Sequence, residues 1–333
     1  MTEKQTALMQ QNKGIYTDLF YMCFPLLAMA IMFYGFRVAL LCATAVITAN
    51  LCDRLVALLR RTPYTKHEWS SEAFAFMLTL LMPATVSYYV VIAGTLATVM
   101  IGKEAFGGYG AYPFHPTAVG YATVAVSWPN QVFQYPEPVL FNALPLGDVS
   151  SVTLVESPLH VLKTGGLPTL DNTKLLLGNY AGPMGITALL VILACALFLW
   201  NRKRIQLHVP VVFLLTCAVI VFFAPRLGDV TPFSMPWTHV ADRLNMVKYE
   251  IGGGGILFAA VFLLTDPVIL PKTRAAQVVY GVLLGIMTMM FRYYGNYETG
   301  VCFALLAVNS ISGWVERTTQ RIVNRKGVIK REC

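Results

Sequence analysis

Charged residues are scarce in this chain of 333 residues, since Asp, Glu, Lys and Arg make up 13% of it and apolar residues 56%. In a soluble domain about a quarter of the residues are charged. The shortage excludes an ordinary soluble enzyme and predicts an all-α membrane protein that crosses the bilayer many times. The first apolar segment, residues 19–36, is too long for the apolar part of a cleaved signal peptide, so we interpret it as a retained helix.

Closely spaced cysteines are absent. The chain has no CxxC or CxxCH pattern, and six of its seven cysteines lie in or beside apolar segments. Zinc sites, iron–sulfur clusters and attached haem need cysteines at such short spacings. We therefore expect thiols that pack as small apolar side chains, and no metal site. A redox role would need a different carrier.

Positive charge is unevenly distributed along the chain, whose net charge is +8. A basic tail beside a membrane is typical of a topology signal or lipid contact, and we do not expect nucleic-acid binding. With the N-terminus inside, the inner segments carry 18 of the 25 Lys and Arg residues. We therefore predict a multi-pass protein of the cell membrane with both termini in the cytoplasm. Six of these cations follow the last apolar segment: Arg317, Arg321, Arg325, Lys326, Lys330 and Arg331.

Ten apolar segments predict about ten transmembrane helices. Four are much shorter than the roughly 20 residues of a full crossing, and these are the third and fifth of each half. Short segments at matching places predict two inverted five-helix repeats with interrupted helices, in residues 19–129 and 184–314. Residues 1–18 and a basic tail, residues 315–333, would lie in the cytoplasm. The ten segments are residues 19–36, 38–59, 73–82, 86–101, 117–128, 185–200, 207–224, 255–264, 275–291 and 300–311.

The longest stretch that cannot lie in a membrane is residues 130–183, which the charge pattern places on the outer side. We call it the outer loop, and it is rich in hydroxyl groups over residues 147–153 and 156–165. The sequence thus offers hydroxyls on the outer side as candidate attachment or binding groups.

Two further features raise functional questions. The run Gly252, Gly253, Gly254 and Gly255 leaves the backbone open to a ring or phosphate, although close helix packing explains it equally well. Asp266 is a candidate for an ion path because a carboxylate at membrane depth is costly. Its place near the inner surface leaves an ordinary interfacial role open.

Several motifs occur in a specific order along nearly the whole chain. They are Ile101-Gly102-Lys103, Phe106-Gly107-Gly108-Tyr109-Gly110, Phe114-His115-Pro116, Leu177-Gly178-Asn179-Tyr180-Ala181-Gly182, Thr265-Asp266-Pro267-Val268, and Arg292-Tyr293-Tyr294-Gly295-Asn296-Tyr297-Glu298-Thr299-Gly300-Val301. Together they resemble the D subunits of Rnf complexes (RnfD), and more distantly the B subunit of the sodium-pumping NADH:quinone reductase (NqrB).

The resemblance implies a ten-helix subunit of a complex that couples electron transfer between ferredoxin and NAD to the movement of Na⁺ or H⁺. It implies FMN bound through a phosphoester to an outward-facing hydroxyl, placed there by a flavin transferase, and a second, non-covalent flavin such as riboflavin. The expected partners are the other membrane and peripheral subunits of the complex.

The resemblance also implies a pattern around the attachment residue, in which the acceptor follows a small residue and Ala and often precedes Pro-Leu. The register through Pro158-Leu159 makes Ser157 the acceptor, although Val155-Glu156 replaces the small residue and Ala. A second register, which starts at Asp148, makes Thr153 the acceptor. Because a carboxylate repels an incoming phosphate, a chain without covalent flavin is the third alternative.

Two other functions stay open at this point. One is an NqrB-like subunit of a sodium-pumping quinone reductase. The other is a secondary transporter without a redox role, because inverted repeats with interrupted helices are typical of that class too. Bound flavin separates the transporter from both redox alternatives.

Overall fold

Helices dominate the computed structural model, which describes residues 14–61, 69–140, 143–203, 205–225, 239–295 and 297–332, with side chains through residue 323. α5 continues into a π-helix, η1 (Ala97–Lys103), and a 3-10 turn, η2 (Glu104–Phe106). The α-helices of the first half are α2 (Ile15–Tyr34), α3 (Arg37–Leu59), α4 (Ser70–Leu80), α5 (Tyr88–Leu96) and α6 (Pro116–Ser127).

The outer loop has short elements of its own. Two strands, β1 (Tyr135–Pro136) and β2 (Leu154–Val155), pair antiparallel. The short helices are α7 (Pro129–Val132), α8 (Pro158–Lys163) and α9 (Asn172–Leu177).

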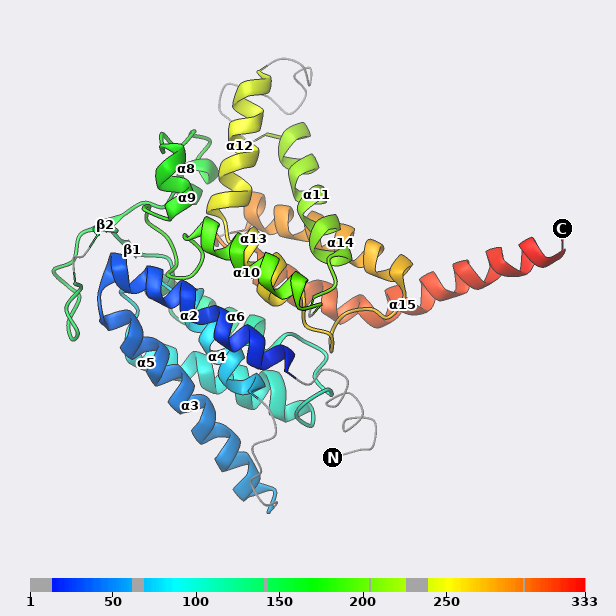
Figure 1. Cartoon of the computed structure of the whole chain (residues 1–333), viewed down its shortest axis with the longest axis horizontal. Helices are drawn as coiled ribbons and strands as arrows, with labels where there is room; N and C mark the ends of the chain where they lie inside the picture. The colour runs from blue at the N-terminus through cyan, green and yellow to red at the C-terminus, as the bar shows by residue number, and fades with distance from the viewer. Residues whose placement is uncertain are drawn as a thin grey trace.

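The second half has a helix at each of its expected segments and one more, α12. Its helices are α10 (Leu189–Asn201), α11 (His208–Phe223), α12 (Val240–Gly253), α13 (Ile256–Phe258) with the π-helix η3 (Ala259–Leu263), α14 (Arg274–Tyr294) and α15 (Val301–Glu332). Figure 1 shows the first half, blue to cyan, gathered on one side and the second half, yellow-green to red, on the other, with α8 and α9 beside α12.

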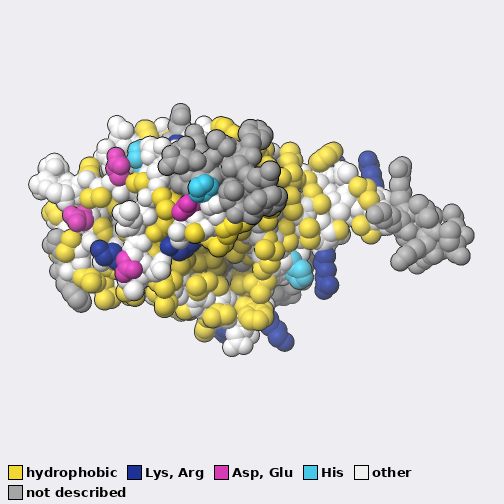
Figure 2. All heavy atoms as spheres, turned by 90° about the horizontal axis from the view of Figure 1, so that it is seen from above, with side chains coloured by type: hydrophobic (Ala, Val, Ile, Leu, Met, Phe, Trp, Pro, Cys, Tyr) yellow, Lys and Arg dark blue, Asp and Glu magenta, His cyan; other side chains and the backbone are white. Residues whose placement is uncertain are grey.

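Each of the ten predicted apolar segments is mainly helical, as expected for a multi-pass membrane protein. By length and composition, four stretches can cross a membrane: α2, α3, α14 and Tyr88–Phe106. α12 together with α13 and η3 is a fifth if this pair, bent by 56°, counts as one span. Figure 2 shows apolar side chains covering much of one face, as a lipid-facing surface requires.

Two helices differ from the prediction. α12 ends at Gly253, inside the glycine run, so the run joins two helices. The apolar pattern missed α12 because it carries Asp242, Arg243, Lys248 and Glu250. α15 continues past residue 311 into the basic tail, which the polar composition had separated from the span. Most of the predicted N-terminal segment, Asn296 and the side chains of the last four basic residues fall outside the described residues.

The third apolar segment of each half lies in the interior. Every residue of α4 is buried, and so is every residue of α13 and η3. The residues just after the outer loop close α4, because the Met184 and Gly185 amides donate to the carbonyls of Met82 and Leu80, at 3.0 and 2.8 Å. These bonds satisfy carbonyls that a helix end leaves without partners. Between the halves, α15 packs against α6, and α10 packs against α2.

Candidate functional site

The β1–β2 pair places the two candidate acceptors on either side of one strand. Tyr135 lies opposite Val155, and the Glu137 amide donates to the Thr153 carbonyl at 3.3 Å. Thr153 directly precedes β2, and Ser157 follows it by two residues. The structure thus brings both predicted hydroxyls to the same corner of the outer loop.

Ser157 is the N-cap of α8. Its backbone is extended, Pro158 follows at the first helical position, and its Oγ accepts the His160 amide at 3.0 Å. A serine N-cap followed by proline is a favoured helix start, which explains why the chain turns into a helix here. The same Oγ donates to Glu298 Oε2 at 2.6 Å, and Ser157 is only 2% exposed. Its hydroxyl is therefore buried, and it both donates and accepts a hydrogen bond.

Glu298 lies between α14 and α15 and faces the start of α8. Burial raises the pKa of this carboxyl, while the Ser157 hydrogen bond and the nearby His160 and Lys163 partly offset the rise. His160 Nδ1 lies 3.5 Å from Glu298 Oε1. A phosphoester on Ser157 would remove the donated proton and bring a phosphate against this carboxylate. Ser157 fits such a group only if Glu298 is protonated, so that it can donate to a phosphate oxygen, or has moved aside.

Thr153 has different surroundings, because it is exposed in the stretch between Asp148 and β2. The start of this stretch is a turn in which the Ser150 amide and hydroxyl donate to Asp148, at 3.0 and 2.8 Å. These two bonds lower the pKa of the Asp148 carboxyl, which stays ionised. Among the described residues, none forms a hydrogen bond with the Thr153 hydroxyl. A phosphate on Thr153 would therefore break no such bond.

Two cavities flank the strand pair. One, of about 440 Å³, is lined by Glu137, Val155 and Glu156 together with Pro158 and residues of the 167–181 stretch. The other, of about 290 Å³, is lined mostly by polar side chains of residues 85–87, 130–134 and 148–150, with Val152 and Leu154. Each candidate acceptor therefore has sequence neighbours that line a cavity large enough for part of a drug-sized ligand.

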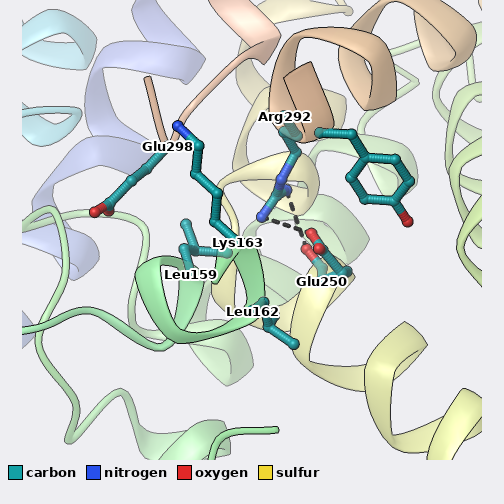
Figure 3. Close-up of a pocket in the computed structure, with 7 residues that line it drawn as sticks. Leu159, Leu162, Lys163, Glu250, Arg292 and Glu298 are labelled. Atoms are coloured by element: carbon teal, nitrogen blue, oxygen red, sulfur yellow. Dashed lines mark hydrogen bonds and ion pairs between the residues drawn. The ribbon is translucent and has the colours of Figure 1, made fainter. Parts of the chain in front are cut away.

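A third space lies beneath α8 and is much smaller, at about 10 Å³. It has room for one water molecule and none for a flavin ring. Figure 3 shows Glu250 and Arg292 pointing toward one another on one side of it, with Lys163 and Glu298 also on its wall. The contact between α8 and the second half is thus tightly packed and lined by charged groups.

Protein side chains fill much of the space beside the glycine run. Arg292 donates to the carbonyls of Glu250 and Gly254, at 3.2 Å each, and its Nη2 lies 2.8 Å from Glu250 Oε2. A Cβ on Gly254 would overlap the Arg292 guanidinium, and a Cβ on Gly255, whose φ is +69°, would come within 2.8 Å of Ile186. These contacts give a packing reason for two of the glycines, and a flavin near the run remains a prediction.

Asp266 lies at the contact between the halves and is 1% exposed. Its Oδ1 accepts the Tyr16 hydroxyl at 2.7 Å and the Val268 amide at 3.0 Å, and its Oδ2 accepts the Tyr112 hydroxyl at 3.1 Å. Two tyrosines of the first half therefore hold a carboxylate of the second. No sequence pattern indicates these partners, which lie 250 and 154 residues away. An ion-path role for Asp266 remains a prediction.

Metal chemistry finds no support among the described residues. Within them, no group of three or more His, Cys, Asp or Glu side chains is placed to hold a metal ion. The residues that sequence reasoning missed are Glu298 and the Arg292–Glu250 pair. Glu298 and Arg292 lie inside one of the motifs that carry the family resemblance, but nothing in that motif indicates which groups they face.

The fold and this site define a multi-pass helical membrane protein with a structured loop docked across two halves. A family model described as "NQR2, RnfD, RnfE family" matches residues 5–324, and the chain belongs to this family. The chain is 29% identical to the D subunit of the ion-translocating oxidoreductase complex of Yersinia enterocolitica, over 90% of each chain.

Two other relatives have more specific names. The D subunit of the Na⁺-translocating ferredoxin:NAD⁺ oxidoreductase complex of Acetobacterium woodii is 28% identical, over 93% of this chain and 89% of its own. The D subunit of the proton-translocating ferredoxin:NAD⁺ oxidoreductase complex of Clostridium ljungdahlii is 26% identical, over 90% of this chain and 87% of its own. The similarity thus extends over nearly the full length of this chain and of each relative.

Proposed function

We propose that this chain is the D subunit of an ion-translocating ferredoxin:NAD oxidoreductase complex of the Rnf type. The observation that carries the proposal is the family match over residues 5–324, joined by relatives that are named as D subunits and match along nearly their whole length. The chain acts as one subunit of a translocase and is not active alone. The names of the relatives include both Na⁺ and H⁺, so the transported ion is one of these two.

We further propose that the outer loop carries FMN through a phosphoester, on Ser157 as first choice and on Thr153 as second. FMN supplies an electron carrier that none of the chain's own side chains provides. The chain would fix the position of the phosphate at the corner between β2 and α8. On Ser157, a protonated Glu298 would hold a phosphate oxygen, and a raised Glu298 pKa makes that protonation less costly. A flavin transferase would install the group, and a second, non-covalent flavin such as riboflavin would complete the set.

The proposed architecture has ten membrane helices in two inverted five-helix repeats. The similar interior positions of α4 and of α13 with η3, each formed by the third apolar segment of its half, support this arrangement. Both termini would face the cytoplasm, since this orientation puts most Lys and Arg residues inside. The other membrane and peripheral subunits, and the lipid bilayer, would cover the apolar outer faces.

Flavin content tests the redox function against the transporter alternative. The whole complex is purified from cells that also express the flavin transferase, precipitated with acid, and the flavin in pellet and supernatant is measured. The proposal predicts flavin that stays with the protein pellet. A complex without flavin in either fraction would contradict the redox function and favour a transporter with inverted repeats. Flavin in the supernatant alone would contradict covalent attachment only.

Asp266 offers a test of ion coupling in the intact complex. Asp266→Asn keeps a side chain that can accept from the tyrosines but removes the charge. We expect ion transport into vesicles to fall more than electron transfer from ferredoxin to NAD. Equal losses of both activities would argue against an ion-path role for this residue.

A further inference from the structure

Arg37, the first residue of α3, holds two distant segments at once. It is 1% exposed, and the partners of its guanidinium are backbone carbonyls. Nε and Nη2 donate to Ala84 and Val86, just after α4, at 2.9 and 3.0 Å. Nη1 lies 2.8 to 3.0 Å from three consecutive carbonyls of the outer loop, those of Pro145, Leu146 and Gly147. A guanidinium has donors directed in a rigid fork, so it can fix both segments relative to each other.

Other contacts hold residues 143–147 of the outer loop in place. The Tyr88 ring lies 5.1 Å from Arg37 Cζ, and its hydroxyl donates to the Leu146 carbonyl at 3.0 Å. The Leu144 amide donates to the Tyr34 carbonyl at 3.2 Å. A Cβ on Gly35, whose φ is +76°, would come within 2.7 Å of Ala143 Cα. Residues 143–147 are therefore fixed to the turn between α2 and α3, in the first half.

The later part of the outer loop is fixed to the second half. The Ser157 hydroxyl donates to Glu298 at 2.6 Å. The Tyr249 hydroxyl donates to the Leu170 carbonyl at 2.8 Å, and Lys248 Nζ lies 2.9 Å from Asn172 Oδ1. Residues 148–156 thus connect an anchor on the first half to an anchor on the second. This connecting stretch carries Thr153 and ends just before Ser157.

We propose that Arg37 is a positioning residue for flavin attachment, because it fixes the start of the stretch that presents the acceptor hydroxyl. This inference rests on the proposed covalent flavin. Without the guanidinium, residues 143–147 lose their three contacts with Arg37 and keep the bonds made by Leu144 and Tyr88. The acceptor stretch between these residues and the β1–β2 pair is then held less firmly and samples more positions relative to the membrane helices. The transferase meets its acceptor less often in the required geometry, and the attached flavin moves more freely.

The experiment compares Arg37→Gln with Arg274→Gln in the full chain within its complex. Arg274 is also the first residue of a helix, but its side chain is exposed. Hydrogen–deuterium exchange is measured without the transferase, and covalent flavin per protein is measured with it. For Arg37→Gln we expect exchange over residues 143–156 to rise about tenfold or more while α14 stays protected, and flavin attachment to fall several-fold. Arg274→Gln should change neither quantity.

Unchanged exchange over residues 143–156 in Arg37→Gln would overturn the inference. So would a rise in exchange accompanied by unchanged flavin attachment, because the anchor would then not position the acceptor. If Arg37→Gln does not assemble, Tyr88→Phe takes its place, since it removes one hydrogen bond to Leu146 and keeps the ring beside Arg37. A smaller rise over the same residues supports the inference, and no rise contradicts it.

The two readouts separate this inference from the proposed function. A chain that carries no covalent flavin in the unmodified form contradicts the proposed attachment, while the exchange data still decide whether Arg37 anchors the loop. Arg37→Lys adds a graded test, because one ammonium group cannot reach both segments as the guanidinium does. We expect its exchange and its flavin content to lie between those of the unmodified protein and Arg37→Gln.

Discussion

Ser157 and Thr153 lie four residues apart in one loop, yet their hydroxyls have opposite surroundings. Ser157 is buried, caps α8 and donates to Glu298, whereas Thr153 is exposed beside a short strand. The residue that the family pattern favours is thus the one whose hydroxyl already has a structural task. Attachment of FMN at Ser157 therefore requires a local change at Glu298, whereas attachment at Thr153 does not.

The largest effect is expected for Ser157→Ala. This change removes an N-cap, which typically costs about 1 kcal/mol, and takes the Ser157 donor from the buried Glu298 carboxyl, for about 1–3 kcal/mol more. We expect α8 to open more readily, by about 2–4 kcal/mol in local stability measured by hydrogen exchange of the His160 and Thr164 amides. Ser157→Thr is the matched control, since it keeps the hydroxyl. If the α8 amides are equally protected from exchange in Ser157→Ala and in the unmodified chain, the Ser157 hydroxyl has no structural role that the Thr153 hydroxyl lacks.

A smaller effect, with a distinct pH dependence, is expected for Glu298→Gln. Burial raises the Glu298 pKa above its ordinary value of 4.5, so the docked loop binds this proton more tightly than the undocked loop does. The stability from this group is therefore fully present below pH 4.5 and is lost as the pH rises through the raised pKa. Exchange of α8 in the unmodified chain should increase over that interval.

Glu298→Gln should remove this pH dependence and change the stability of α8 at acidic pH by about 1 kcal/mol or less, because the amide oxygen can still accept from Ser157. The measurement is α8 exchange, corrected for the intrinsic pH dependence of amide exchange, in both proteins. A parallel pH dependence in the two would mean that another group is responsible. Asp148→Asn is a suitable control, since the Asp148 carboxyl is on the exposed side of the loop.

The smallest effect is expected for Thr153→Ala. An exposed side chain away from caps and cores usually changes stability by less than about 0.5 kcal/mol. The carbonyl of residue 153 would still accept the Glu137 amide, so the β1–β2 pair should persist. Exchange of α8 and of the strand pair should match that of the unmodified chain. A loss of protection as large as in Ser157→Ala would remove the contrast between the two positions.

The sequence predicts most of the long helices but not the residues that they contact. Each predicted apolar segment is mainly helical in the structure, because hydrophobicity is a local property of the chain. Runs of apolar residues missed α12, whose charged face includes Glu250 and packs against Arg292. They also separated α15 from its basic extension, since hydropathy reports on burial in lipid and not on helix continuity.

The site was predictable only in part, for a similar reason. Hydroxyls and a Pro after Ser157 are visible in the sequence, and they indicate both an attachment motif and a helix start. Glu298 lies 141 residues from Ser157, and no spacing rule connects them. Arg37 likewise reaches carbonyls 108 to 110 residues away. Backbone carbonyls carry no residue-type signal, so such an anchor appears only in the folded structure.

Mass spectrometry of the flavin-bearing peptide tests the central claim most directly. The full chain is expressed with its partner subunits and a flavin transferase, separated on a denaturing gel and viewed under ultraviolet light, with Ser157→Ala and Thr153→Ala in parallel. We expect a fluorescent band whose FMN maps to Ser157 and is lost in Ser157→Ala alone; loss in Thr153→Ala alone would assign the exposed hydroxyl instead. A dark band from the unmodified chain, with transferase activity confirmed on another flavinylated protein, would contradict covalent flavin on this loop.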